Sequence, residues 1–412
     1  MKGILKKALI FFGVLGPSVI TTMAGNDGAG VITYSMAGAS FGYAMLITLP
    51  FLTFLYAITQ EMGSRVAIVS GKGLGDIIRE RFGIRIATLV FILIIVANFG
   101  TLLTDFAALK LAGTMLNIPV IPLIAITILF CFLLVTFSNY EKSQKVFLTG
   151  IVFYLAYLFS AMKASPDWGS TVTHLIIPDN SIFTKGFLIA SMAVLGTTIT
   201  PWGQFFVQSY MKDKNVSSDR LGYAKLEAFL GAFLSNFFTY FMMVATAATL
   251  FLHKIPLTSG EQAALAIKPF VGNLASTFFA IGLINAAIIG IVIISLTSAY
   301  AFSEFFGFSG SLDDPYNKGK TFYTIFLLSM IFPALLVITP LFPLFAIVLY
   351  TQSLNGILLP IFFFFLLKIV NDKNLMGKYV NGRIYNFVAI GSTILIVIAA
   401  LVTIVYGIIP NL

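Results

Sequence analysis

The chain has 412 residues, with 25 Lys and Arg against 16 Asp and Glu, which gives a formal net charge of +9 at pH 7. Hydrophobic residues make up 58% of it and charged residues only 10%, and the mean hydropathy is +0.98. This composition excludes a soluble globular protein and is typical of a chain that crosses a membrane many times. The single cysteine, Cys131, excludes a disulfide framework and a cysteine-based metal site.

Apolar stretches long enough to cross a membrane recur along the whole sequence and predict eleven helices. We expect them to pack as a single domain over residues 1–412, because no long polar linker separates them. The expected spans are 8–37, 43–69, 86–112, 119–137, 146–162, 184–211, 223–252, 270–302, 321–338, 342–367 and 384–409.

The Lys and Arg residues divide unevenly between the predicted loops. With the N-terminus in the cytoplasm, 20 of the 25 fall in cytoplasmic segments and five in outer segments, as expected for membrane proteins. We therefore expect a multi-pass protein of the cell membrane with its N-terminus inside and its C-terminus outside. Topology and contact with anionic lipid explain the positive charge, which indicates no nucleic-acid partner.

The first span carries a carboxylate among glycines, in the stretch Gly25-Asn26-Asp27-Gly28-Ala29-Gly30. A carboxylate at the centre of a membrane costs about 2.5 to 3.5 kcal/mol on insertion scales, and three glycines within six residues weaken the helix. An unwound membrane helix points free carbonyl groups and the dipole ends of its halves into the bundle, which suits a small cation. Asp27 is therefore the first candidate ligand. The alternative is that Asp27 only caps the second half of the helix.

The sixth span contains a second weak point, Leu195-Gly196-Thr197-Thr198-Ile199-Thr200-Pro201. Its proline removes a backbone donor, and its glycine and threonines disfavour a helix. A five-helix unit repeated in inverted orientation would pair this span with the first, with repeats over 1–163 and 184–370 and an additional helix over 383–409. Two broken helices at matching places would then enclose one site halfway through the membrane.

Longer motifs along the chain form a recognisable series. Gly16-Pro17, Asp27 and AGASFGY over 37–43 lie in the first span, and QEMGSRVAIVSGKGLGDIIRERFG occupies 60–83. LLTDFA at 102–107, Pro166-Asp167-Trp168, LASTFFAIGLINAA at 274–287 and LMGKYVN at 375–381 follow. Together they resemble the NRAMP family of divalent metal transporters over nearly the whole chain. The resemblance implies an all-α membrane protein with eleven transmembrane helices, a LeuT-type 5+5 inverted repeat and broken first and sixth helices.

In that family the ion site combines the Asp and Asn of a DPGN motif with a backbone carbonyl and a Met sulfur of an AxxMPH motif. The resemblance therefore implies a metal site at Asp27, Gly30, Thr197 and Thr200, where Gly30 replaces the Asn and Thr200 replaces the Met. Without sulfur, and with a roomier site, the oxygen donors favour a hydrated hard cation such as Mg²⁺. The pattern is similar to the NRAMP-related magnesium transporters, although a Thr at this position also resembles the aluminium-transporting plant branch.

Other polar residues in the spans are secondary candidates. Gln204 and Gln352 could direct amide groups toward the ion or its waters, while Asn26, Asp105 and Trp202 could line the transport pathway. Three of them have a structural alternative: Gln352 as a bond between helices, Asp105 as the partner of an internal donor, and Asn26 as a side chain that points away from the site.

The positions that the family uses for proton movement read Asn98, Asp105 and Ala108 in the third span and Trp202 in the sixth. Only Asp105 can titrate, and a proton relay needs several such groups. We therefore expect transport driven by the ion gradient and the membrane potential, without coupled protons.

The sequence thus predicts a carrier for Mg²⁺, or another hard cation such as Mn²⁺, that works by alternating access. The alternatives are a proton-coupled Mn²⁺ or Fe²⁺ symporter of the NRAMP type and a divalent cation channel. We expect no enzyme, since neither a His-Glu-x-x-His nor a G-x-S-x-G motif occurs. The expected partners are the transported cation and the lipid bilayer, with no cofactor, and a monomer is compatible with the sequence.

Overall fold

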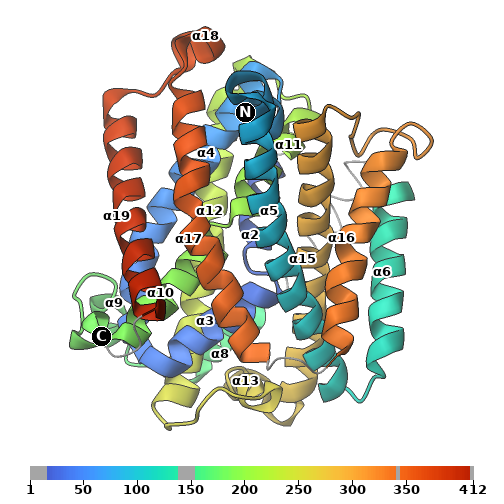
Figure 1. The fold of residues 1–412 in the computed structure, drawn as a ribbon. Coiled ribbons are helices and arrows are strands. Elements are labelled where there is room, and N and C mark those ends of the chain that lie inside the picture. The colour runs from blue at the N-terminus through green and yellow to red at the C-terminus, as the bar shows by residue number, and fades with distance from the viewer. Residues whose placement is uncertain (1–15, 138–153, 340–343, 409–412) are drawn as a thin grey trace, which may run out of the picture.

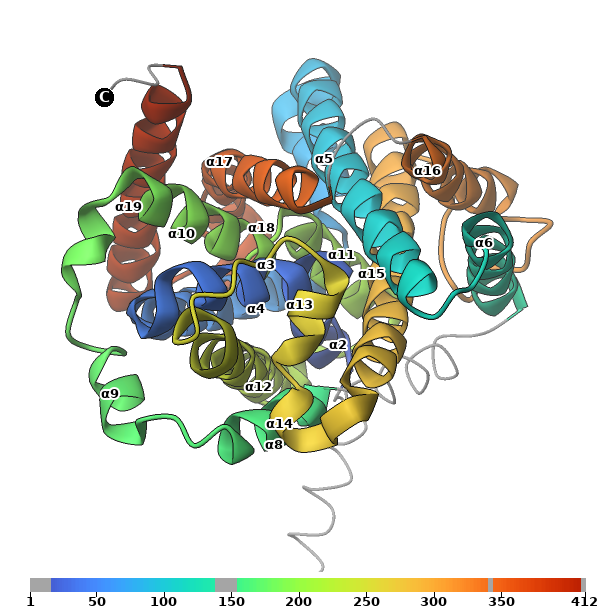
Figure 2. The ribbon, with the colours of Figure 1, turned by 90° about the horizontal axis from the view of Figure 1, so that it is seen from below.

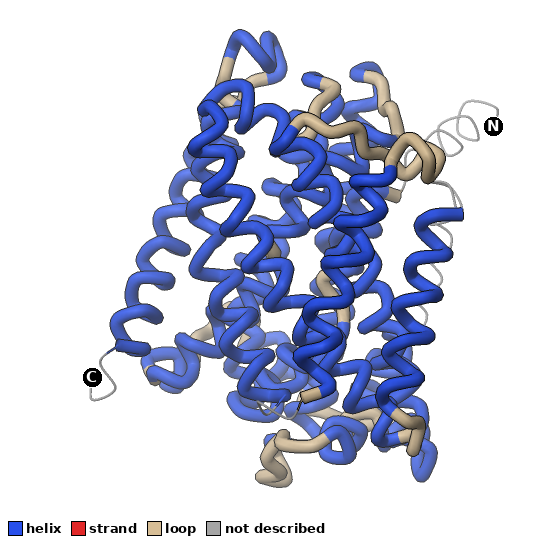
Figure 3. Tube along the Cα trace, turned by 45° about the vertical axis from the view of Figure 1, so that its right-hand side comes forward, coloured by secondary structure: helices blue, strands red, loops and turns tan. Residues whose placement is uncertain are grey.

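The computed structural model describes residues 16–137, 154–339 and 344–408, and within these ranges the regular structure is entirely helical (Figure 3). The first half contains α2 (Pro17–Ala24), α3 (Gly28–Phe41), α4 (Thr48–Ser70), α5 (Leu74–Met115), α6 (Val120–Phe137), α8 (Leu155–Lys163) and α9 (Trp168–Thr173). The second half contains α10 (Lys185–Thr198), α11 (Pro201–Asp213), α12 (Leu221–Thr246), α13 (Gly260–Leu265), α14 (Lys268–Val271), α15 (Ala275–Phe306), α16 (Lys320–Ile338), α17 (Leu344–Val370), α18 (Lys373–Met376) and α19 (Arg383–Ile408).

The long helices run between two opposite faces of the bundle (Figure 1). The connections over 307–319 and 371–382 lie at one face, and those over 164–184 and 252–274 lie at the other. This separation agrees with the predicted division into cytoplasmic and outer loops. Which face meets the cytoplasm stays a prediction from the Lys and Arg distribution.

The broken helices lie near the middle of the bundle, whereas α6, α16 and α19 lie at its rim (Figure 2). Rim helices expose large apolar side chains, such as Ile126 on α6 and Leu401 on α19, which are 64% and 58% exposed. The central half-helices are buried almost throughout. Because lipid is as apolar as these rim residues, the exposed surface fits a bilayer and the polar residues collect inside.

Within the described residues, nine helical stretches are long and apolar enough to cross a membrane. One of them, Gly28–Ser70, joins the second half of the first predicted span to the second span. About half of the predicted fifth span, 146–162, lies outside the described residues, which begin there at Tyr154. The count of eleven spans and the inverted repeat therefore stay predictions, whereas the breaks in the first and sixth spans are present.

Glycines allow the central helices to approach closely. A Cβ atom on Gly196 of α10 would overlap the Gln352 carbonyl oxygen and the Gly356 nitrogen of α17. Small residues at such contacts let helix backbones pack against one another, which is a main source of stability where lipid replaces water. The contact also holds α10 in place two residues before its helix ends at Thr198.

We predict that Gly196→Ala lowers the unfolding free energy by about 1 to 3 kcal/mol, as overpacking does, because the backbone of α17 must move. Thermal unfolding of the purified protein in detergent measures the effect. Gly391→Ala in α19 is the matched control, since its Cβ would meet nothing within 4 Å. Equal melting temperatures for the two variants would contradict the role of Gly196.

Candidate cation site

The first span is broken where the sequence predicted. α2 ends at Ala24 and α3 begins at Gly28, which leaves Asp27 in the unwound segment. Asp27 has an extended backbone, and its Oδ1 accepts a 2.7 Å hydrogen bond from the Gly30 N–H. The carboxylate therefore lies at the positive end of the α3 dipole. The capping role foreseen as an alternative is present, and it uses one of the two carboxylate oxygens.

Two tyrosines hold the backbone carbonyls of the first span near this break. The Tyr154 hydroxyl donates to the Asn26 carbonyl at 2.7 Å, and the Tyr56 hydroxyl donates to the Thr21 carbonyl at 3.2 Å. All four residues are buried, so these bonds satisfy polar groups that the membrane interior cannot solvate. The break is thus fixed by partners from neighbouring helices.

The sixth span is broken in a similar way. α10 ends at Thr198 and α11 begins at Pro201. Thr200 between them is extended, and its Oγ1 accepts a 3.0 Å hydrogen bond from the Gly203 N–H. Thr200 therefore caps α11 as Asp27 caps α3, while the last carbonyl groups of α10 lie at a free helix end.

The two breaks meet. A Cβ on Gly25 would lie 3.5 Å from the Thr197 carbonyl oxygen and 3.6 Å from that of Thr198. The Tyr34 hydroxyl connects the first span to the sixth. It lies 3.0 Å from the Thr198 Oγ1 and donates a 3.5 Å hydrogen bond to the Gly25 carbonyl. The negative end of α10 and the carboxylate of Asp27 therefore lie at one junction. This combination of carboxylate, carbonyl and hydroxyl oxygens is a donor set for a hard cation.

A second carboxylate lies beside the first. The Asp105 Oδ1 accepts a 3.1 Å hydrogen bond from the Ala29 N–H, while its Oδ2 has no partner within the described residues. A Cβ on Gly290 of α15 would overlap the Asp105 Oδ2 and would lie 2.8 Å from the Asp27 Cβ. Two buried carboxylates cannot both stay charged without a cation or a proton between them. Sequence reasoning placed Asp105 on the pathway, and the structure places it at the junction.

Gly30 has a different role from the one expected. A Cβ at this position would overlap the Gly25 carbonyl oxygen and would lie 3.4 Å from the Asp27 Oδ1. The prediction that Gly30 opens room for the ion is therefore wrong, because the backbone of the unwound segment fills that space. Gly30 instead allows the chain to fold back and donates the bond that positions Asp27.

The prediction that Asn26 lines the transport pathway is also corrected by the direction of its side chain. Its Nδ2 donates to the Ser235 Oγ at 3.3 Å, and its Oδ1 accepts from the Thr239 hydroxyl at 3.1 Å. Both partners belong to α12, so the side chain points away from α10 and ties the break to α12. The sequence could not show this direction, since it depends on backbone angles within the unwound segment.

Gln352 lies on α17, where its backbone carbonyl packs against Gly196. Its Oε1 accepts a 3.1 Å bond from the Asn355 Nδ2, and the same Nδ2 donates to the Thr101 hydroxyl of α5 at 2.9 Å. This geometry agrees with the alternative of a bond network between helices.

Trp202 and Gln204 follow the second break on α11 and are fully buried. The Trp202 Nε1 and both amide atoms of Gln204 have no partner within the described residues. The third span adds a neutral contact, in which the Asn98 Nδ2 donates to the Ser298 Oγ of α15 at 2.9 Å.

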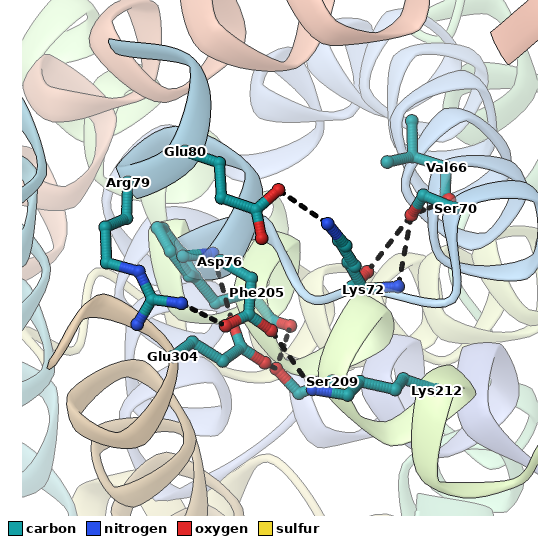
Figure 4. Close-up of polar contacts among 11 residues, drawn as sticks. Val66, Ser70, Lys72, Asp76, Arg79, Glu80, Phe205, Ser209, Lys212 and Glu304 are labelled. Atoms are coloured by element: carbon teal, nitrogen blue, oxygen red, sulfur yellow. Dashed lines mark hydrogen bonds and ion pairs between the residues drawn. The ribbon is translucent and has the colours of Figure 1, made fainter. Parts of the chain in front are cut away.

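A polar network fixes the end of α11 that lies away from the junction (Figure 4). The buried Glu304 of α15 accepts from the Ser209 hydroxyl at 2.6 Å and from the Gly75 N–H at 3.0 Å. Asp76 forms an ion pair of 3.1 Å with Lys212. These contacts connect α11, α15 and the start of α5.

The corresponding end of α2 is capped from α12. The Glu227 Oε1 accepts from the N–H groups of Gly16 at 2.6 Å and Ser18 at 3.0 Å. Burial lowers the pKa of the nearby Lys214 to about 8, and the Glu227 carboxylate opposes that shift. Both inner half-helices are thus anchored at their far ends by buried acidic residues.

A family model described as Natural resistance-associated macrophage protein-like, Nramp, matches residues 18–406. The chain belongs to the Nramp family. Members of this family are membrane transporters and not enzymes, so the chain is a multi-pass transporter. Membership confirms the family resemblance seen in the sequence, although the magnesium-transporter branch is not confirmed.

Individual comparisons agree with this assignment. The chain is 24% identical to "Divalent metal cation transporter MntH" of Yersinia enterocolitica over 95% of this chain and 94% of that protein. The fold is similar to that of the Eremococcus coleocola manganese transporter, with a TM-score of 0.76 and 18% identity, over 96% of this chain and 86% of that one. MhsT in complex with L-phenylalanine has a TM-score of 0.64 at 15% identity, over 94% of this chain and 96% of that one. The last two similarities concern the fold alone, and these structural neighbours are Nramp and LeuT-fold transporters.

We predict that Gly290→Ala weakens Mn²⁺ binding about tenfold, or about 1.4 kcal/mol, because its methyl group would enter the space between Asp105 and Asp27. Isothermal titration of the purified protein measures the affinity. Gly282→Ala on the same helix is the matched control, because its Cβ would meet nothing within 4 Å. Unchanged affinity in Gly290→Ala would place the ion away from the two carboxylates.

Proposed function

We propose that this Nramp chain carries a divalent metal cation across the membrane through the junction of its two broken helices. The observation that carries the proposal is the position of Asp27, a buried carboxylate in the unwound segment whose Gly25 lies against the carbonyl end of α10. A membrane protein retains a buried carboxylate at such a place for an ion or a proton.

Manganese is the substrate that the comparisons favour. Two of the similar proteins are named as a divalent metal cation transporter and a manganese transporter. Mn²⁺ accepts carboxylate, carbonyl and water ligands, as the junction offers. This support favours the manganese alternative over the Mg²⁺ interpretation drawn from the sequence.

Magnesium is a second candidate because of one feature of the site. Thr200 occupies the position of the family's methionine, so the second break offers oxygen where the family has sulfur. Mg²⁺ prefers oxygen ligands and keeps several waters. A site without sulfur has little means of rejecting Mg²⁺ on ligand type, and competition between the two ions separates the candidates.

A carrier is favoured over a channel by the burial of the junction. Asp27, Thr197 and Thr200 are each only 1% exposed, so neither face of the protein has open access to them. An ion bound there can leave only after α2, α11 or their neighbours move, which is the behaviour expected of alternating access.

We predict that proteoliposomes containing the protein take up Mn²⁺ and that Asp27→Ala abolishes uptake, because the junction loses its charged ligand. Asp167→Asn is the matched control, since Asp167 also caps a helix, accepting from the Ser170 N–H at 3.1 Å, but lies in a connection at one face. Uptake by Asp27→Ala at the wild-type rate would refute the site.

The same uptake assay also shows which cation the transporter prefers. Mg²⁺ in large excess blocks Mn²⁺ uptake if both use the oxygen donors of the junction, and it has little effect if the site selects Mn²⁺ or Fe²⁺. Uptake far above carrier rates would instead support the channel alternative.

We predict that Mn²⁺ uptake leaves the internal pH of the proteoliposomes unchanged. Of the positions that the family uses for proton movement, only Asp105 can titrate, and Asn98, two turns earlier on α5, makes a neutral bond to Ser298. A membrane potential of 100 mV supplies ~4.6 kcal/mol for a divalent ion, which is sufficient to drive accumulation. Internal acidification that follows the Mn²⁺ concentration would establish a proton-coupled symporter.

A further inference from the structure

Three buried glutamines on α4 and α11 have amide groups without partners. Gln60, Gln204 and Gln208 are fully buried. Within the described residues, both amide atoms of Gln60 and of Gln204 and the Oε1 of Gln208 make no hydrogen bond. Unpaired amides at membrane depth are costly, so a native protein retains them where water or a ligand completes their bonds.

The glutamines belong to one contact between the two helices. The Gln60 Nε2 lies 3.8 Å from the Cβ position of Gly203, and the Gln208 Nε2 lies 3.6 Å from that of Gly63. Gln204 and Gln208 are four residues apart, so they lie on the same face of α11. The Gln208 Nε2 also donates a 3.2 Å hydrogen bond to the Gln204 backbone carbonyl, so the Gln208 side chain lies along α11 toward Gln204.

This group begins at the candidate cation site. The Cβ position of Gly203 that lies near Gln60 is also 2.9 Å from the Thr200 Oγ1, the cap of the second break. From there α11 runs to Asp213, toward the polar network around Glu304 (Figure 4). α2 packs against α4 beside the glutamines, since the Ser18 hydroxyl of α2 lies 3.1 Å from the Ser64 hydroxyl of α4.

Amide oxygens suit a hard divalent cation that keeps part of its water, and they do so without a charge. Such a ligand set binds more weakly than the carboxylates of the junction. A conduction path works when each position binds an ion well enough to receive it and weakly enough to release it. A neutral amide group next to a charged site meets that requirement on the exit side.

We propose that Gln60, Gln204 and Gln208 form a second cation position, through which a partly hydrated divalent ion passes between the junction and the face at which α11 ends. The inference rests on the proposed function, because it concerns the same ion. The glutamines bind the ion after it leaves the junction and before it is released.

The first experiment measures Mn²⁺ uptake by proteoliposomes containing Gln204→Leu, Gln208→Leu or the Gln60→Leu variant. We expect the maximal rate to fall about tenfold while the half-saturating external concentration changes less than about twofold, because the junction is intact. Gln208→Asn retains an amide oxygen and should recover part of the rate, which separates a lost ligand from a misfolded chain.

Asn236→Leu is the matched control. Asn236 is also buried with an unpartnered amide oxygen, but it lines an apolar groove between α4 and α12. Its substitution should leave uptake at the wild-type rate. Wild-type rates in all three glutamine variants would overturn the proposal while leaving the function of the junction intact.

The second experiment tests binding directly and does not depend on transport. The variant Gln204→Glu, Gln208→Glu is combined with Asp27→Ala, and bound Mn²⁺ is measured by electron paramagnetic resonance. We expect one retained Mn²⁺ per chain in the combined variant and none in Asp27→Ala alone. Absence of Mn²⁺ from the combined variant means that the glutamines support only structural water and overturns the proposal, even if the wild type takes up Mn²⁺.

Discussion

The structure depends on a carboxylate held where a membrane helix has lost its regular hydrogen bonds. Asp27 accepts the N–H of Gly30, so the unwound segment and the charge stabilise each other. Without the charge, the free N–H groups of α3 would lack a partner in an apolar surrounding, and without the free helix end the carboxylate would lack a partner of its own. Neither half of this arrangement is stable alone inside a bilayer, and together they keep a buried carboxylate at the break.

The surrounding residues hold the break by its backbone. The Tyr154 and Tyr56 hydroxyls donate hydrogen bonds to carbonyls of the first span, and the Asn26 side chain is hydrogen-bonded to α12. The far ends of the inner half-helices are also held, α2 by Glu227 and α11 by Glu304 and by the Asp76–Lys212 ion pair. The junction is thus fixed by bonds from several helices, and acidic side chains hold the far ends of the inner half-helices. An alternating-access transporter needs a site that stays assembled while one side of the protein opens.

The sequence predicted the breaks because their causes are local. Glycines around Asp27, and Pro201 after a run of threonines, disfavour a helix whatever surrounds them. The composition predicted the membrane environment for the same reason. In contrast, the direction of Asn26 depends on the backbone angles of three unwound residues, and the position of Asp105 beside Asp27 depends on the packing of α5 against α15 at Gly290. Those facts belong to tertiary structure, and no spacing along the chain encodes them.

Gly30 illustrates why a motif comparison misjudges a substitution. The change from an amide to a glycine suggests a larger site, yet the Gly25 carbonyl occupies the volume that a side chain would need. The backbone therefore compensates for the lost side chain. The oxygen that the family draws from an asparagine has no side-chain equivalent at this position, and Asp105 brings a second carboxylate to the same junction. In the site that we propose, a cation between the two carboxylates and the carbonyl end of α10 would be bound through charge more than through ligand softness, which favours hard divalent ions over those that need sulfur.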